Sequence, residues 1–257
     1  MEDIKESVRR QFSPVAAAYA ASPVHAGGPD LAALVAAAEP TGRERALDVG
    51  SGPGHTALAL APHVAAVTAL DLSQEMLDQG AALAAERGLS NVQFLRGDAE
   101  RLDLPDAAFD IVTSRYSAHH YPRPAAVLRE IARVLRPGGR LLLVDVVAPE
   151  EPARDTFLNA IELLRDPSHV RDHSVSQWQA MLREAGLAPD LLETWPLRLE
   201  FASWTARMRT PEPAAAQIRW LMDVAAEEIR AAFAIEPDHS FTVTVALLRA
   251  RRPDSAP

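Results

Sequence analysis

The chain has 257 residues, of which 48 % are hydrophobic, and this suits one domain with a sizeable core. It contains no cysteine, which excludes disulfides, thiolate zinc sites and a cysteine nucleophile. The formal net charge of −9 makes DNA or RNA a poor substrate class, because proteins that bind nucleic acid usually carry a basic surface.

The apolar segments indicate where the protein resides. No apolar segment follows basic residues near the N-terminus, so we expect no signal peptide. The most apolar stretches, such as residues 141–148, have the length of a strand and are too short to span a bilayer. We therefore expect a cytoplasmic protein without a membrane span.

The first two thirds of the chain alternate short apolar runs with helical patterns, which is typical of βαβ units and a parallel sheet. Strands are predicted at residues 45–49, 66–72, 92–96, 109–114 and 140–147. Helices are expected at 55–61, from the N-cap Ser73 to Gly88, and from Pro124 to the Pro-Gly-Gly at 137–139. The helix from Ser73 is predicted to face inward with Met76, Leu77, Gly80, Ala81 and Ala84. The helix from Pro124 is predicted to face inward with Val127, Leu128, Ile131, Val134 and Leu135.

The pattern changes after Pro149. The sequence predicts helices at 154–165 and 176–185, a strand near 191–200, a long helix at 213–233 and a last strand at 241–249, followed by a loose tail from Arg251. The long helix is expected to bury Ile218, Leu221, Met222, Ala225, Ile229 and Phe233. Trp178 and Trp220 are interpreted as core residues, whereas Trp204 is a candidate lid over the substrate.

The strongest local signal is the turn after the first strand, ALDVGSGPG at residues 46–54. Glycines are needed where a strand turns sharply into a helix and the backbone lies against a ligand. The spacing is GxGxG, whereas GxGxxG supports a pyrophosphate. Asp48 precedes the turn, and a carboxylate there suits the ammonium and sulfonium of S-adenosylmethionine.

Two further acids close the next two strands. Asp71 can accept hydrogen bonds from both ribose hydroxyls, as in dinucleotide folds, and Asp98 can meet the adenine amino group. Either acid alone is equally well explained as a solvated strand end. Together with Asp48 and the glycine turn they indicate a nucleotide site, because ligands of open α/β sheets bind at the carboxyl ends of the strands.

These motifs occur in order over residues 41–149: LDVGSGPG, VTALDLSQEML, NVQFLRGDAERLDLP, FDIVTSRY and VLRPGGRLLLVDVVAP. The segment resembles class I S-adenosylmethionine-dependent methyltransferases, in particular the branch of ubiquinone/menaquinone biosynthesis C-methyltransferases and related small-molecule enzymes. The resemblance implies an α/β fold with a Rossmann-like seven-stranded sheet of order 3-2-1-4-5-7-6. It also implies an antiparallel last-added strand, helices on both faces and a helical insertion, or lid, after strand five.

The resemblance also implies a division of labour. Residues 1–40 would form helices over the cofactor site, 41–149 the cofactor-binding core, 150–250 the substrate-pocket helices and last strands, and 251–257 a loose tail. Contacts to S-adenosylmethionine are expected from Tyr19, Asp48, Gly50, Ser51, Gly52, Asp71, Leu72, Met76, Asp98, Ala99, Glu100, Ser114 and Arg115. The fourth strand ends in Ser-Arg-Tyr and not in Asn/Asp-Pro-Pro-aromatic, which argues against methylation of DNA bases.

Candidate chemical groups follow the fourth strand. Methyl transfer is an in-line displacement that needs a base only if the acceptor loses a proton first. His119 and His120 are the candidate bases, His120 preferred, with Tyr116 as a hydroxyl partner. The alternative is that one histidine caps or packs the following helix.

A second polar cluster spans residues 165–173, with two histidines and several charges. Arg165 or Arg171 is a candidate clamp for an anionic substrate, with His169 beside it. The alternative is a surface loop held by its own Arg–Asp pairs. No metal-ligand spacing such as HExxH is present, so no metal is expected.

The leading functional hypothesis is O-, N- or C-methylation of a small, partly apolar metabolite. The alternative is a protein that binds S-adenosylmethionine without transferring methyl, such as a cofactor-assisted cyclase. A nicotinamide oxidoreductase is disfavoured by the glycine spacing. A homodimer is compatible with the sequence.

Overall fold

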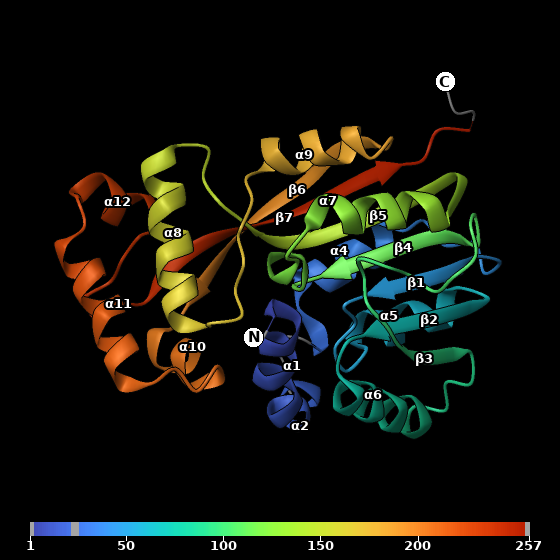
Figure 1. Ribbon diagram of the computed structural model, residues 1–257, viewed down its shortest axis with the longest axis horizontal. Helices are drawn as coiled ribbons and strands as arrows, with labels where there is room; N and C mark the ends of the chain where they lie inside the picture. Colours follow the sequence, from blue (N-terminus) through green and yellow to red (C-terminus); the bar gives the residue numbers. More distant parts are fainter. Residues whose placement is uncertain (1–2, 22–25, 255–257) are drawn as a thin grey trace.

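A computed structural model describes residues 3–21 and 26–254 of the chain (Figure 1). Its centre is one seven-stranded sheet with the order β3-β2-β1-β4-β5-β7-β6. The strands are β1 (Arg45–Val49), β2 (Ala66–Asp71), β3 (Val92–Arg96), β4 (Phe109–Arg115), β5 (Leu135–Val147), β6 (Ala188–Leu199) and β7 (Phe241–Arg251). This is the sheet order predicted from the sequence, which is therefore confirmed.

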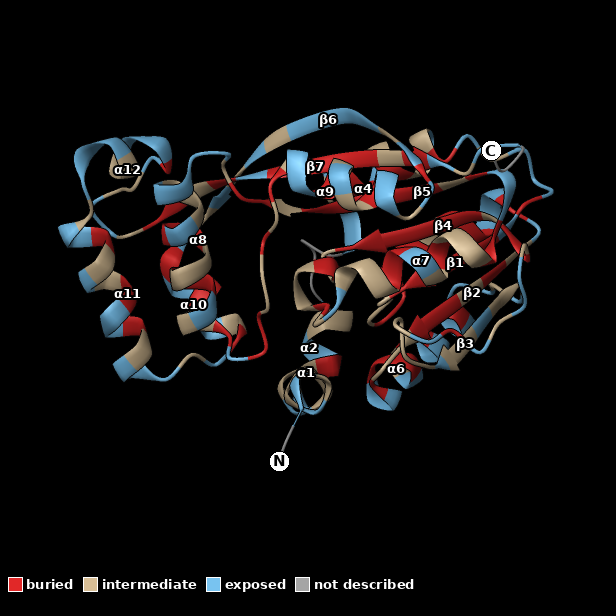
Figure 2. Ribbon diagram, turned by 45° about the horizontal axis from the view of Figure 1, so that its top comes forward, coloured by how far each residue is buried: buried red, intermediate tan, exposed pale blue. Residues whose placement is uncertain are grey.

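The direction of the strands is also as predicted. Strands β1 to β5 pair in parallel, and β7 is antiparallel to both β5 and β6. Central strands β4 and β5 are buried over most of their length, whereas the edge strand β6 is largely exposed (Figure 2). Apolar runs without alternation therefore marked the central strands, since helices cover both of their faces.

Helices pack on both faces of the sheet. The elements before β6 are α1 (Ile4–Phe12), η1 (Ser13–Val15), α2 (Ala16–Ala20), α4 (Pro29–Ala37), α5 (His55–Leu60), η2 (Ala61–His63), α6 (Gln74–Glu86), η3 (Ala118–His120), α7 (Pro124–Val134), α8 (Pro152–Arg165) and α9 (Val175–Glu184). One apolar core joins α7 and α9 to one face of β1, β4 and β5, and a second joins α4 and α5 to the other. Local signals set two helix starts: Ser73 accepts from Met76 N, and Pro124 begins α7.

A third core lies beyond the end of the sheet. It joins α8 to the helices that follow β6, namely α10 (Phe201–Arg207), α11 (Glu212–Val224) and α12 (Glu227–Ala232). Figures 1 and 2 show these four helices together at one side of the molecule, joined to the sheet through the long strands β6 and β7. Of these helices, α8 follows strand five, as expected, whereas α10, α11 and α12 follow β6.

The long helix predicted at 213–233 is wrong in one respect. Ala225 and Ala226 have extended backbone, so the segment forms α11 and α12 with a break between them. Arg230 donates to the Met222 carbonyl and satisfies the end of α11. The apolar spacing continues through the break, which is why the pattern did not reveal it. Trp220, expected in the core, is 61 % exposed on α11.

Other boundaries also need correction. Helix α10 was not predicted at all. The tail is ordered to residue 254 where looseness was expected: Arg251 pairs with Arg140 in the sheet, and the Arg252 guanidinium donates to the carbonyls of Ala132 and Leu135. The rest of that tail, residues 255–257, lies outside the described residues. Leu135 belongs to β5 and not to the preceding helix, and Ala81 is exposed.

Candidate active site

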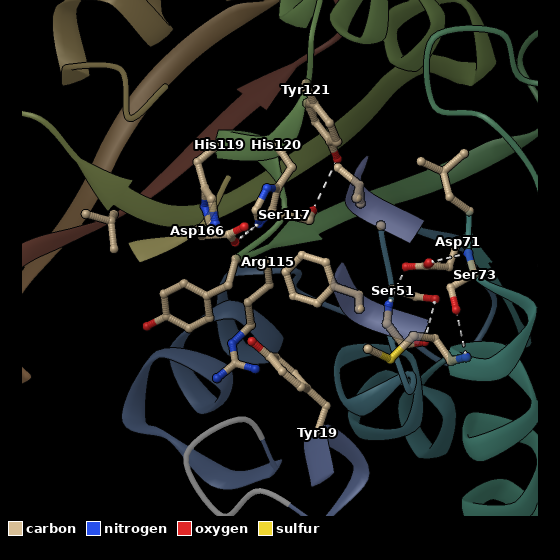
Figure 3. A pocket seen from close by; sticks show the side chains of 18 of the residues that line it. Tyr19, Ser51, Asp71, Ser73, Arg115, Ser117, His119, His120, Tyr121 and Asp166 are labelled. Atoms are coloured by element: carbon tan, nitrogen blue, oxygen red, sulfur yellow. Dashed lines mark hydrogen bonds and ion pairs between the residues drawn. The ribbon is translucent and has the colours of Figure 1, made fainter. Parts of the chain in front are cut away.

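A cavity of about 550 Å³ lies at the carboxyl ends of β1, β2 and β4 (Figure 3). The N-terminal helices α1 and α2 supply one wall, and α8 and α10 supply another. Its volume falls within the range typical of small-molecule sites, about 300–1,000 Å³. The site lies where ligands of open α/β sheets bind.

The glycine turn forms the floor of this cavity. Gly50 and Gly52 both have positive φ, +66° and +53°. A Cβ on Gly50 would lie 2.6 Å from Ser117 Oγ, whereas a Cβ on Gly52 would meet no protein atom within 4 Å. The missing side chain of Gly52 therefore keeps space open for a ligand, and that of Gly50 lets the loop after β4 approach the glycine turn.

Asp71 fixes the shape of the turn. One of its carboxylate oxygens accepts from Gly52 N at 2.8 Å and the other from Ser73 N at 2.9 Å. Burial raises the pKa of Asp71, although its backbone hydrogen bonds act to lower that pKa. Asp71 lines the cavity, so the same carboxylate orders the turn and faces a ligand.

The segment that follows the carboxyl end of β3 contacts helix α1. Lys5 Nζ lies 2.6 Å from Asp98 Oδ2 and 2.5 Å from Glu100 Oε2. Arg123 also pairs with Glu100. Lys5 is the single lysine of the chain, and no local pattern predicts its contact with residues more than ninety positions away. This contact ties the N-terminal helix to the wall where the adenine was expected.

Most of the residues predicted to bind the cofactor line this cavity. They are Tyr19, Gly50, Ser51, Gly52, Asp71, Leu72, Met76, Asp98, Ala99, Glu100 and Arg115. Asp48 and Ser114 do not: Asp48 is 1 % exposed behind the turn and accepts from Thr113 Oγ1 at 2.7 Å. Burial raises the pKa of Asp48 to about 7. The Ser114 hydroxyl is hydrogen-bonded to Ser117 and Tyr121, and Ser117, not singled out before, lines the cavity. The contact expected from Asp48 and Ser114 is thus not direct in this geometry.

His119 and His120 both line the cavity from η3. The Asp145 carboxylate accepts from Ala118 N, His119 N and His119 Nδ1, at 2.9, 3.2 and 2.7 Å. His120 Nδ1 donates to the Ser168 carbonyl at 3.0 Å, since a carbonyl only accepts. Each ring is therefore held by Nδ1, and His120 Nε2 lies 3.9 Å from Asp166 Oδ2. The alternative, that one histidine caps the following helix, does not describe these contacts.

The two histidines have opposite pKa shifts. Burial acts to lower the pKa of His119, but Asp145 and then Asp172 raise it to about 9. Burial and the neighbouring His119 charge lower the pKa of His120. The ring centroids lie 4.2 Å apart. At neutral pH the pair therefore holds one imidazolium, His119, and one neutral imidazole, His120.

Tyr116, the expected hydroxyl partner, also lines the cavity. Its φ of +51° is unusual for a bulky residue and places a strained turn directly after β4. Burial raises the pKa of Tyr116, so its hydroxyl keeps its proton at neutral pH.

The polar cluster at 165–173 is divided by the structure. Arg165 lines the cavity, pairs with Glu162 at 3.2 Å and lies over the Trp204 ring, which also lines the cavity. His169 and Arg171 do not line it, because His169 contacts Asn159 and Arg171 pairs with Asp155. The segment is not the surface loop of the alternative interpretation, since Asp166, Ser168, His169 and Asp172 are all buried.

One group of described residues, His119, Asp145 and Asp172, brings possible metal-ligand atoms within 4.8 Å of one another. Asp145 accepts four N–H groups, including Val146 N at 2.9 Å, which uses the lone pairs of its two oxygens. Hydrogen bonding thus accounts for Asp145 and His119, whereas Asp172 Oδ2 has no hydrogen-bond partner among the described residues. That no metal is bound stays a prediction.

Besides Lys5 and Ser117, three further residues of the site escaped sequence reasoning. Asp145 left a signal, a lone acid in the apolar strand at 140–147. Glu162 and Arg207 left none, because their place in the cavity depends on how the insertion packs and α10 was not predicted.

Comparison with known proteins agrees with this geometry. Residues 47–143 match the model of a methyltransferase domain family. The uncharacterized methyltransferase YcgJ of Bacillus subtilis is 43 % identical over 87 % of this chain and 88 % of its own length. The 27-O-demethylrifamycin SV methyltransferase of Amycolatopsis mediterranei is 33 % identical, over 82 % of this chain and 78 % of that enzyme.

Solved structures give the same result. The crystal structure of YcgJ superposes with a TM-score of 0.85 and covers 88 % of this chain and 99 % of that one, at 39 % identity. The [4+2]-cyclase SpnF superposes with a TM-score of 0.64 at 26 % identity, covering 96 % of both chains. The sheet order, the glycine turn and the extent of the sequence match lead to one conclusion: this chain belongs to the class I S-adenosylmethionine-dependent methyltransferases.

Proposed function

We propose that the enzyme methylates a hydroxyl group of a small acceptor, with His120 as the proton acceptor. The observation that carries this proposal is the His119–His120 pair, whose pKa values are shifted in opposite directions beside the glycine turn. Pairs of titratable groups with separated pKa values are typical of acid and base partners in catalysis. The relative that methylates 27-O-demethylrifamycin SV is an O-methyltransferase by name, which supports a hydroxyl acceptor.

The cofactor end of the cavity fits S-adenosylmethionine. Gly52 leaves open the space that a side chain would fill, and Asp71 presents a carboxylate beside it. When bound, the cofactor supplies an electrophilic methyl group. We assign Gly50 and Gly52 to its amino-acid part, Asp71 to the ribose, and Asp98 with Ala99 to the adenine.

At the acceptor end the chain moves one proton. His120 is neutral at physiological pH, and its Nδ1–H is held by the Ser168 carbonyl, so Nε2 carries the lone pair that takes the acceptor proton. His119, protonated and oriented by Asp145, stabilises negative charge that develops on the acceptor oxygen. The remaining contribution is positioning and the exclusion of water by the surrounding helices.

Three parts of the chain divide this work in our proposal. Residues 1–40 cover the cofactor, 41–149 bind it, and 150–250 enclose the acceptor. Helices α1, α8 and α10 close the cavity from two sides, which favours a small molecule over nucleic acid. No helix among the described residues is long and apolar enough to cross a membrane.

One observation favours a second candidate function. The likeness to SpnF, a [4+2]-cyclase, supports a reaction without methyl transfer. Such a protein would keep the cofactor end unchanged and would not need a proton acceptor at Nε2 of His120.

The test is mass-spectrometric turnover of isotopically labelled S-adenosylmethionine against a panel of phenols, quinols, hydroxy acids and amines. We expect labelled O-methyl product and S-adenosylhomocysteine in equal amounts. Gly52→Val serves as the control that cannot hold the cofactor. Product labelled on nitrogen or carbon would contradict the hydroxyl assignment. Converted acceptor without label or S-adenosylhomocysteine would support the cyclase alternative.

A further inference from the structure

Five arginines line the cavity, and they differ in how their charge is balanced. Four of them pair with an acid among the described residues. The pairs are Arg9–Glu6, Arg115–Asp30, Arg165–Glu162 and Arg198–Glu236. The side chain of the fifth, Arg207, has no hydrogen bond and no ion pair in the part of the chain that the structure describes.

Arg207 is nevertheless well inside the protein. Its Nε is buried without a hydrogen-bond partner. Burial lowers the pKa of Arg207, and the positive charge of Arg165 lowers it further. An arginine does not lose its proton in proteins, so this is a standing cation in a partly dry site.

Such a cation is costly when nothing balances it. Removing a charge from water is unfavourable unless the charge is paired and hydrogen-bonded. Glu162 lies near enough to act on Arg207, but its carboxylate already accepts from Arg165 at 3.2 Å. The described residues therefore leave Arg207 without a counter-charge, and a ligand of opposite charge would supply one.

The position of Arg207 indicates which ligand. It ends α10, three residues after Trp204, which lies against Arg165. The charges that act on Arg207 include Arg165 and Glu162, and Glu162 also acts on His119. Arg207 thus belongs to the insertion wall, on the side of the histidines.

We infer that Arg207 binds an oxyanion of the acceptor, so that the substrate is a small hydroxy compound that also carries a carboxylate or a phosphate. This inference rests on the proposed function and names its substrate class. Of the two clamp candidates expected from the sequence, Arg165 and Arg171, it sets aside Arg171, because Arg171 is paired with Asp155 and does not line the cavity. Arg165 remains a neighbour that adds positive charge.

A carboxylate also has a second source, the amino-acid part of the cofactor itself. Tyr19 acts on Arg207, and Tyr19 is among the residues expected to bind the cofactor. The experiment must therefore separate an anion that belongs to the acceptor from the carboxylate of S-adenosylmethionine.

The test uses the full-length protein saturated with S-adenosylhomocysteine, whose own carboxylate then fills the cofactor site. Benzoate and inorganic phosphate are titrated into this complex by calorimetry, with uncharged benzamide as the control. We expect benzoate or phosphate to bind and benzamide not to bind, and the tighter of the two anions identifies the oxyanion. Binding of neither anion would overturn the inference.

Variants at Arg207 make the test specific. Arg207→Met should weaken anion binding at least tenfold and change the affinity for S-adenosylhomocysteine less than twofold. It should also raise the Tm of the ligand-free protein by about 2–4 °C, because it removes an unbalanced buried charge. Arg207→Lys should keep part of the anion binding without the gain in Tm. Arg183→Met, an exposed position on α9 outside the cavity, is the control and should change none of the three.

Two results would contradict the assignment to the acceptor. A tenfold loss of S-adenosylhomocysteine affinity in Arg207→Met would assign Arg207 to the cofactor carboxylate. A lower Tm with unchanged anion binding would make Arg207 structural. If the wild-type protein did not bind S-adenosylhomocysteine at all, the proposed function would fail before the anion titration began.

Discussion

The two ends of the cavity are built in different ways. At the cofactor end, one carboxylate holds the backbone of two turns: Asp71, at the end of β2, accepts from Ser73 N two residues on and from Gly52 N in the turn after β1. At the acceptor end, side chains from distant elements hold each other: Asp145 of β5 fixes His119, and Ser168 after α8 fixes His120. The first end binds a constant cofactor, and the second can change with the acceptor.

Both ends of the cavity keep buried polar atoms that have no hydrogen-bond partner among the described residues. At the cofactor end these are Asp48 Oδ2 and Glu100 Oε1, and at the acceptor end they are Asp172 Oδ2 and Arg207 Nε. Unsatisfied buried polar groups are rare in folded proteins and need an explanation. We explain the unsatisfied groups at the acceptor end by the acceptor molecule, which would supply their missing partners and which differs between relatives.

Replacement of His120 is the strongest test of the difference between the cofactor end and the acceptor end. His120→Ala should lower turnover about 10²–10⁴-fold, the usual contribution of a general base, and leave the affinity for S-adenosylhomocysteine within twofold. Labelled-methyl turnover and calorimetry measure the two effects separately. His63→Ala, an exposed histidine of η2 outside the cavity, is the matched control.

A loss of turnover matched by an equal loss of cofactor affinity would show that the two ends are not separable. Full turnover in His120→Ala would mean that positioning alone drives the reaction. A neutral amine or a soft carbon would then be the better acceptor.

The opposite result is expected at Gly52. Gly52→Val should weaken S-adenosylhomocysteine binding by about 100-fold or more, because the side chain would enter open space in the cavity at a positive φ. Gly88→Val is a close control: Gly88 also has a positive φ, +67°, and open space around its Cβ position, but lies outside the cavity. It should lower Tm without changing affinity. Equal affinity losses in both variants would indicate backbone strain and not a filled site.

The same division explains what the sequence could predict. The glycine turn, the Ser73 cap and the Pro124 helix start are local signals, and each was found because its physical cause lies within a few residues. The sheet order came from the family resemblance and was confirmed.

Contacts between distant segments could not be read in this way. The bridge from Lys5 to Asp98, and the fit of Arg207 beside Arg165, depend on how whole elements pack. Helix α10 was missed because a short helix of seven residues has little periodicity to detect. For the acceptor end, the sequence therefore predicted candidate residues but not the contacts between them.

Smaller losses of cofactor affinity are expected when Asp71 and Asp98, the two acids of the cofactor end, are replaced. Asp71→Asn should weaken S-adenosylhomocysteine binding about tenfold, because an amide can accept only through one oxygen and the turn needs two acceptors. Asp98→Asn should cost about threefold, since one backbone bond to Glu100 can be kept and Lys5 still has Glu100. Calorimetry measures both. Equal or reversed losses would exchange the ribose and adenine assignments.

The smallest expected effect is a shift in pH dependence caused by His119. His120 must be deprotonated to act, so turnover falls when the pH drops below its pKa. Because burial and the His119 charge lower that pKa, the acid limb of wild-type kcat should lie below the ordinary imidazole value of about 6.5. His119→Asn removes the charge and keeps a donor for Asp145, so the limb should move to higher pH. A shift of about one unit is reasonable, since a charge at this distance is worth more than about 1.4 kcal/mol.

The alkaline side gives an independent check with the opposite sign. Above about pH 9, His119 loses its proton and with it the charge that stabilises the acceptor oxygen, so wild-type kcat should fall there. His119→Asn should lack this alkaline limb, and Asp145→Asn, which removes the first of the groups that raise the pKa of His119, should move it to lower pH. Measuring kcat from pH 4.5 to 10 with an acceptor found by the turnover panel tests both limbs. An acid limb that stays in place or moves to lower pH in His119→Asn would show that the two histidines do not act as a coupled pair, and His119 would then belong to the loop's structure alone.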